Sequence, residues 1–138
     1  MDNVLEDVSV VLKEYYSAYL DAINDQNPRL LRHVTYDQEQ RLRERISDSV
    51  NQTDIFRFSH IVIDLDTLRL SQGGRTLLSF TASFHFSYQD RRTRGDWNQL
   101  FNVQTVEMVF DEQGRAWLVD FGVLIHPDPL GANQRIVR

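Results

Sequence analysis

Hydrophobic and polar residues follow two different periods along this chain. Up to about residue 50 the apolar positions recur every three to four residues, which is the spacing of one face of an amphipathic helix. From about residue 54 onward apolar residues alternate with polar ones, which is the spacing of a β-strand with one buried face. The sequence therefore predicts helices first and strands after them.

Three helices are predicted in the first part of the chain. One covers residues 3–24, and a short one opens at Asn27-Pro28, an N-cap followed by proline in the first turn, and runs to Val34. The third covers residues 37–50, and its narrow apolar face predicts that it covers the core rather than passing through it. The apolar stripe of the first helix comprises Val4, Leu5, Val8, Val11, Leu12, Tyr15, Tyr19, Ala22 and Ile23, and that of the third comprises Leu42, Ile46 and Val50.

Four strands are predicted in the second part, over residues 61–70, 78–88, 97–110 and 117–125. The first two are joined by a hairpin turn at residues 72–74, and the last two by a turn at residues 111–114. Changes of parity near Asp66-Thr67 and within 97–110 predict bends. The core-facing positions are predicted to be Leu78, Phe80, Ala82, Phe84, Phe86 and Tyr88 on one strand and Trp117, Val119, Phe121 and Val123 on another.

This order of elements predicts an α+β fold with N-terminal helices packed on a strongly curved, cone-like antiparallel sheet. We expect a single domain over residues 1–126, because Pro127 and Pro129 end the last predicted strand. The tail over residues 127–138 is expected to be loosely held.

Composition narrows the possible partners. The 138 residues include 20 acidic and 15 basic side chains, a net charge of -5 that disfavours nucleic acid as a partner. Cysteine is absent, so disulfides and thiolate chemistry are excluded. No apolar run approaches the roughly 20 residues of a membrane span, so this segment is not expected to insert into a membrane. The four histidines, His33, His60, His85 and His126, do not follow a metal-ligand spacing, and neither a metal nor another cofactor is predicted.

The chain resembles the nuclear transport factor 2-like superfamily, whose fold is a cone-shaped α+β domain. The resemblance is carried by "YYSAYLDAIND" at the end of the first helix, by "NPRLLRHV" after it, and by the closing hairpin "VEMVFDEQGRAWLVDFGVLI". The pattern looks most like the non-enzymatic bacterial envelope domains of teicoplanin-resistance-associated proteins. This resemblance implies an extracytoplasmic location; without it, a cytoplasmic one is equally compatible with the sequence.

Two functions follow from the resemblance. One is a non-catalytic domain that holds a small apolar ligand or a protein partner; the other is a small isomerase, dehydratase or polyketide cyclase with a pocket between the first helix and the sheet. An enzyme of the second kind needs an acid or base on the core side, yet Asp120 and His85 have the outward parity, so no catalytic residue is predicted. The candidate pocket residues are Tyr15, Tyr19, His33, Tyr36, Phe84 and Trp117.

Two surfaces are candidates for contact with partners. The outer face of the central strand carries Thr81, Ser83, His85 and Ser87, which are small or uncharged, and predicts a homodimer through that face. The segment "YQDRRTRGDWNQLF" lies between two long strands and predicts a hairpin loop over residues 90–96, with Gly95 supplying the unusual backbone angle. Its three arginines, Arg91, Arg92 and Arg94, form a local basic cluster whose contact with a phosphate or an acidic partner stays open.

Overall fold

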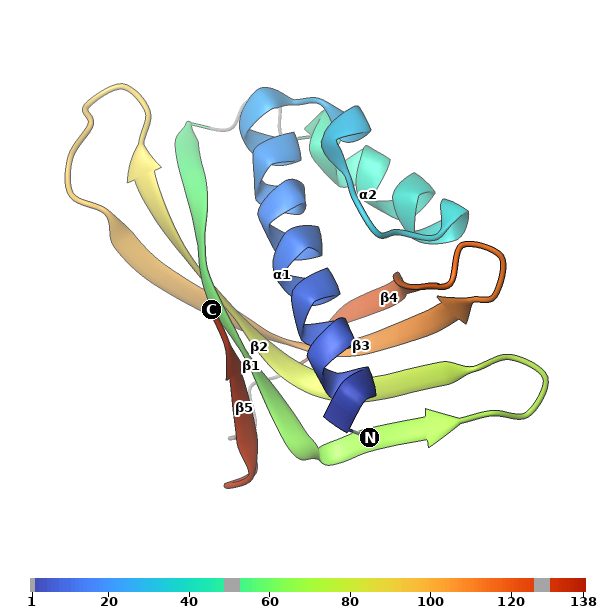
Figure 1. Cartoon of the computed structure of the whole chain (residues 1–138). Coiled ribbons are helices and arrows are strands. Elements are labelled where there is room, and N and C mark those ends of the chain that lie inside the picture. Colours follow the sequence, from blue (N-terminus) through green and yellow to red (C-terminus); the bar gives the residue numbers. More distant parts are fainter. Residues whose placement is uncertain (1, 49–52, 126–129) are drawn as a thin grey trace.

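The predicted helical stripe buries itself against the predicted sheet. In the computed structural model, which describes residues 2–48, 53–125 and 130–138, helix α1 (Asp2–Asp25) lies across the concave face of a five-stranded antiparallel sheet (Figure 1). Its innermost side chains, Val8 and Leu12, are fully buried among sheet residues such as Ile61, Ile63 and Met108. The α+β fold class is confirmed.

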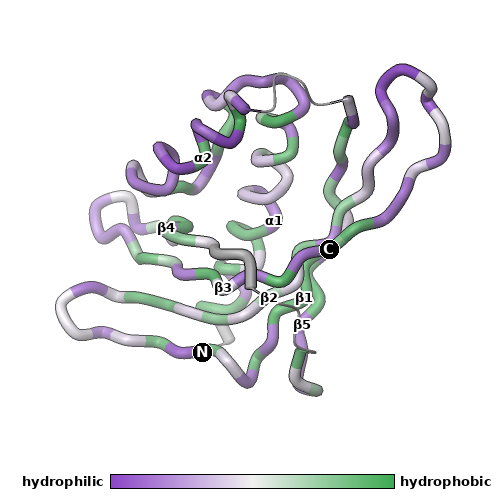
Figure 2. The backbone as a smooth tube through the Cα atoms, turned by 180° about the vertical axis from the view of Figure 1, so that it is seen from behind, coloured by the Kyte–Doolittle hydropathy of each residue, from purple (hydrophilic) through white to green (hydrophobic). Residues whose placement is uncertain are grey.

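The sheet consists of four long strands and one short one. They are β1 (Asp54–Ser71), β2 (Leu77–Asp90), β3 (Asn98–Asp111), β4 (Ala116–Ile125) and β5 (Gln134–Val137), in the order β4-β3-β2-β1-β5. The predicted core face of β2 is confirmed, because its even-numbered positions from Leu78 to Phe86 are buried. Figure 2 shows the same pattern as hydrophobic segments in the middle of the sheet and hydrophilic hairpin ends.

Register shifts bend two of the strands. The bend predicted near Asp66-Thr67 is confirmed as a register shift of β1 against β2 between Asp64 and Arg69. The parity change within 97–110 is different: β3 stays in unbroken register with β2, and Phe101 and Val103 lie on the outer face. The parity change therefore reflects apolar residues on both faces of β3 and not a shift against β2. The predicted bend itself is seen as the curvature of β3 in Figure 1, and the pairing of β3 with β4 shifts between Glu107 and Met108.

A bulge in β4 changes which of its residues face the core. Glu107 pairs with Phe121 while the next residue, Met108, pairs with Val119, so Asp120 is the extra residue. Trp117 and Val119 are buried as predicted, but the prediction that Phe121 faces the core was wrong: it lies on the outer side beside exposed Glu107. The side chain predicted for position 123 lies outside the described part of the chain, as do Val50, Pro127 and Pro129.

The second helix is shorter than predicted. The second helical segment is a single 3₁₀ turn, η1 (Pro28–Leu30), with Asn27 as its confirmed N-cap accepting a hydrogen bond from the Arg29 amide. Val34 forms an isolated parallel bridge with Val119, flanked by backbone hydrogen bonds of His33 and Thr35 to Val119, and His33 has a left-handed φ of 58°. The helix predicted as far as residue 34 therefore ends earlier. Thr35 then caps helix α2 (Tyr36–Asp48) by accepting from the Gln38 amide.

The C-terminal segment is part of the sheet. Residues predicted to form a loosely held tail instead form β5, which pairs with Ile61–Asp64 of β1 and buries Val137. The buried carboxylate of Asp64, 6% exposed, accepts hydrogen bonds from the amides of Gly131 and Asp66. A Cβ atom at position 131 would meet Asp66 Oδ2 at 2.7 Å, which favours glycine there. This anchoring corrects the expectation of a loose tail.

Candidate functional site

A cavity of about 320 Å³ lies between α1, α2 and the concave face of the sheet. Its size falls within the range of small-molecule sites. Helix α1 and strands β1 and β2 contribute mainly aromatic and aliphatic walls, whereas α2 and β3 contribute amides and one guanidinium. The lining residues are Tyr15, Tyr16, Tyr19, Leu20, Ile23, Gln38, Leu42, Arg45, Phe56, Phe84, Phe86, Asn102, Gln104 and Gly122.

The aromatic wall of the cavity is held by side-chain hydrogen bonds at two places, one at Tyr16 and one at Phe56. The ring of Tyr16 packs against that of Phe84, with the ring centroids 4.3 Å apart, and the Tyr16 hydroxyl donates to Gln104 Oε1 at 2.8 Å. At the other end, the side chain of Asn24 accepts from the Phe56 amide at 2.8 Å and donates to the Phe56 carbonyl at 2.7 Å. Within the described residues, β5 pairs with Ile61–Asp64 on this edge of β1 but no strand reaches Phe56, so the two bonds to Asn24 take the place of a strand partner and hold Phe56 in the cavity wall.

The hydroxyls of Tyr15 and Tyr16 remain protonated at physiological pH. Burial raises the pKa of Tyr15 to about 12, and this rise is opposed by the hydrogen bond from Gln38 and by the positive charge of Arg45. Burial also raises the pKa of Tyr16 well above its ordinary value. Both groups can therefore serve as neutral hydrogen-bonding groups, while proton abstraction would require an unfavourable phenolate.

The cavity brings together three of the six predicted pocket residues. Tyr15, Tyr19 and Phe84 line it, whereas His33, Tyr36 and Trp117 do not. Tyr36 is 73% exposed at the start of α2, and Trp117 is buried edge-on against Phe110.

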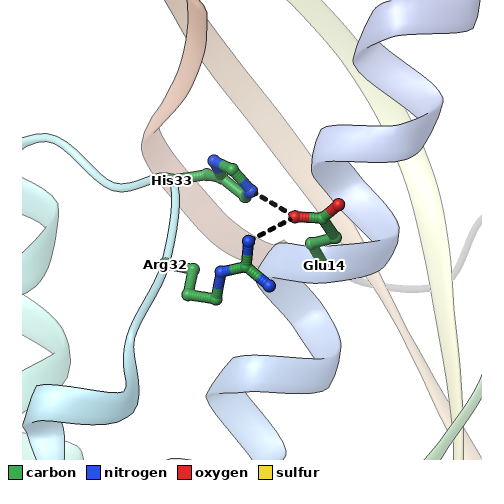
Figure 3. Close-up of polar contacts among 3 residues, drawn as sticks. All are labelled: Glu14, Arg32 and His33. Atoms are coloured by element: carbon green, nitrogen blue, oxygen red, sulfur yellow. Dashed lines mark hydrogen bonds and ion pairs between the residues drawn. The ribbon is translucent and has the colours of Figure 1, made fainter.

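His33 belongs to a separate polar contact between α1 and the segment that precedes α2. Its Nε2 lies 2.7 Å from Glu14 Oε2, and Arg32 Nη2 lies 2.8 Å from the same oxygen (Figure 3). The hydrogen bond from His33, more than the charge of Arg32, lowers the pKa of Glu14. This contact ties α1 to residues 33–35, whose backbone bonds to Val119 of β4.

Sequence reasoning missed the polar part of the lining. Asn102 and Gln104 occupy inward-facing positions of β3, opposite Phe84 and Ala82, where an apolar pattern would continue. Gly122 faces the cavity only because of the bulge at Asp120, and a Cβ there would lie 3.1 Å from Gln104 Oε1. The signal that was available is the pair of amides at alternate positions of a strand face that otherwise carries Leu100, Val106, Met108 and Phe110.

The two outward-facing candidates for acid-base chemistry lie away from the cavity lining. Asp120 accepts a hydrogen bond from Thr35 Oγ1 at 2.7 Å, beside the edge of β4. His85 stacks on the outer face between His60, at 4.2 Å, and Phe101, at 5.2 Å. Within residues 2–48, 53–125 and 130–138 there is no cluster of three or more side chains that could hold a metal ion.

The arginine-rich segment is a hairpin loop, as predicted, and it projects beyond the body of the sheet between β2 and β3 (Figure 1). Asp90 Oδ1 accepts from the amides of Arg92 and Thr93, which shapes the turn and lowers the pKa of Asp90. The unusual backbone angle lies at Arg94, with φ of 53°, so its assignment to Gly95 was wrong. Arg91 is attached to the body of the domain, since its guanidinium donates to the Asn24 carbonyl.

The fold and the cavity define a cone-shaped α+β domain of the nuclear transport factor 2-like class. The chain matches the family described as the YvbJ NTF2-like domain over residues 8–121, and it belongs to that family. This membership confirms the superfamily resemblance and is consistent with the narrower resemblance to bacterial envelope domains.

A solved structure shares the fold. The crystal structure of the intermembrane space region of chloroplast protein ARC6 aligns with a TM-score of 0.60 and 12% identity, over 87% of this chain and 95% of that one. No curated protein matched the chain. None of the described helices is long and apolar enough to cross a membrane.

Proposed function

We propose that this domain is a non-catalytic binding module whose cavity holds a small apolar ligand. The observation that carries the proposal is the chemistry of the lining: it offers aromatic rings, amides and a guanidinium, and none of the described lining residues is a carboxylate or an imidazole. An isomerase or dehydratase of this fold class would need an acid or base with a shifted pKa inside the cavity. Tyr15 and Tyr16 do not supply one, because burial raises the pKa of each and keeps both neutral.

The aromatic wall supports binding of apolar groups. Phe56, Phe84 and Phe86 pack against one another and present ring faces and edges to the cavity. The wall continues outward to Leu100, which pairs with Phe86 across the strands and is 51% exposed. An apolar ligand would remove this surface from water, at a gain of about 25 cal/mol per Å².

The test is binding of a neutral apolar dye, N-phenyl-1-naphthylamine, whose fluorescence rises in apolar surroundings. Asn102→Trp places a large ring in the cavity from a strand position and should abolish the fluorescence increase. Gln99→Trp is the matched control, because it lies on the same strand with the opposite parity and is exposed. Equal dye binding by wild type and Asn102→Trp would contradict the proposal.

A homodimer through the outer sheet face is a second part of the proposal. Phe101 is 53% exposed on that face, where it continues the stack of His60 and His85 across three strands. Isolated exposed aromatic residues are common, so the aligned stack is what favours a contact between two copies.

A further inference from the structure

Among the described residues, the lining of the cavity contains one cationic group, the guanidinium of Arg45, and this group has no ion-pair partner. Of the three arginines on α2, Arg43 pairs with Glu39, and Arg41 bonds to Gln38 and to the Asp120 carbonyl. Arg45 lines the cavity, and its side chain makes no hydrogen bond or ion pair with any described residue. Its guanidinium is therefore available to an anion.

Arg45 and the buried Tyr15 both line the cavity, and Gln38, the hydrogen-bond partner of Tyr15, lies seven residues before Arg45 on the same face of α2. The positive charge of Arg45 also opposes the rise in the pKa of Tyr15, which agrees with this placement. Tyr15 accepts a hydrogen bond from Gln38 Nε2 at 3.0 Å, and its own proton is donated to no described residue. A guanidinium beside a hydroxyl proton is a suitable pair of donors for a carboxylate.

The remaining lining suits an uncharged chain. Residues Leu20, Ile23, Phe56 and Phe86, from the end of α1 and from the adjoining strands, are apolar. A volume of about 320 Å³ corresponds to roughly ten water-sized groups, so it fits an unbranched chain of about ten carbons.

We propose that the ligand of this cavity is an amphipathic carboxylate, with its head group bound by Arg45 and Tyr15 and its hydrocarbon chain lying along the phenylalanine wall. This inference rests on the proposed function, because it names the class of ligand that the same cavity takes. It adds a specificity residue, Arg45, which a purely apolar site would not need.

The experiment compares three ligands that share a ten-carbon chain and differ in head-group charge: decanoate, 1-decanol and decyltrimethylammonium. Each displaces N-phenyl-1-naphthylamine from the wild type and from Arg45→Met, which keeps an apolar side chain but removes the charge. Arg43→Met is the matched control on the same helix, because Arg43 is exposed and is not a lining residue. Arg45→Lys tests whether charge alone restores binding.

We expect wild type to bind decanoate most tightly and the cationic ligand least tightly. Arg45→Met should weaken decanoate about tenfold and leave 1-decanol unchanged, since a charge-assisted hydrogen bond at an exposed arginine is partly screened by solvent. Arg45→Lys should recover part of the loss, because lysine keeps the charge but not the planar fork. Arg43→Met should change neither ligand.

Two results would overturn the inference, and they have different meanings. If Arg45→Met weakens decanoate and 1-decanol equally, or neither, the anion site is refuted while the apolar cavity stands. If wild type binds neither the dye nor any of the three ligands, the proposed function fails as well. A urea melt of each variant separates lost binding from lost folding, because Arg45 also lies in the last turn of α2, where its charge favours the helix.

Discussion

The C-terminal segment should contribute measurably to stability through the carboxylate of Asp64. Its two oxygens accept from the amides of Asp66, at 3.1 Å, and Gly131, at 2.9 Å, at a site that is 6% exposed. In Asp64→Asn an NH₂ group replaces one of the two acceptor oxygens. This NH₂ group then faces a backbone N–H, so two donors meet and one hydrogen bond is lost. A lost hydrogen bond to a charged group at a buried site costs about 1.5–3 kcal/mol.

The assay is urea unfolding followed by circular dichroism. For a slope of about 2 kcal/mol/M, the predicted loss lowers the midpoint by roughly 0.7–1.5 M without a change of slope. Amide hydrogen exchange should also accelerate over residues 130–138, because the segment opens more often when its anchor is weakened. The control is Asp66→Asn, whose exposed carboxylate accepts no hydrogen bond from the amides of the described residues and should shift stability by no more than about 0.5 kcal/mol.

An unchanged midpoint in either of two variants would exclude anchoring by the C-terminal segment. If Asp64→Asn unfolds at the wild-type midpoint, the carboxylate does not anchor the segment. A chain that ends before Leu130 provides an independent check, because it removes β5 and with it the buried side chain of Val137. An unchanged midpoint for that shorter chain would refute the inclusion of β5 in the cooperative fold.

Three further predictions concern the outer face and the arginine-rich loop. Burial lowers the pKa of His60 and of His85, and the charge of Arg138 and the neighbouring His60, respectively, lower them further. The unfolded chain therefore binds more protons near pH 6 than the folded one, so the free energy of unfolding should be highest above about pH 6.5 and fall as the pH drops through the folded-state pKa values. Urea midpoints between pH 5 and 8 should show a shallower acid loss for His85→Phe, which keeps the ring stack, and identical profiles would contradict the prediction. Sedimentation velocity should show a dimer that Phe101→Asp dissociates, because a carboxylate would be desolvated in the contact; a wild type that stays monomeric at high concentration would rule the dimer out. Replacement of the three loop arginines by serine should leave the circular dichroism spectrum unchanged and cost less than about 1 kcal/mol, since one solvent-exposed contact to α1 is lost; loss of the fold would show that the loop is not independent of it.

The elements that were predicted from sequence are those whose signal is local and repeated. The stripe of α1 and the alternation of β2 each extend over many residues, so a single exception does not obscure the period. The same is true of the N-cap at Asn27 and the hairpin loop after Asp90, where a few neighbouring residues determine the conformation.

The features that were missed depend on distant residues. The bulge at Asp120 is a mismatch between two strands, and strand β4 alternates smoothly through it in sequence. Strand β5 is only four residues long and is stabilised by Asp64, some 70 residues earlier in the chain. The positive φ at Arg94 rather than Gly95 is the exception, because it follows from local hydrogen bonds to the side chain and backbone of Asp90, four residues or fewer away.

By itself, the sequence determined the order of helices and strands, the inward face of α1 and β2, and the aromatic character of the interior, because periodic burial is written into neighbouring positions. Only the tertiary structure decided the cavity. The sheet curves around α1 and α2 closes over it, so that Tyr15, Arg45 and Gln104, which no local pattern connects, line one space. The physical reason is that a binding site is a property of surfaces brought together by folding, whereas a hydrophobic period is a property of one segment.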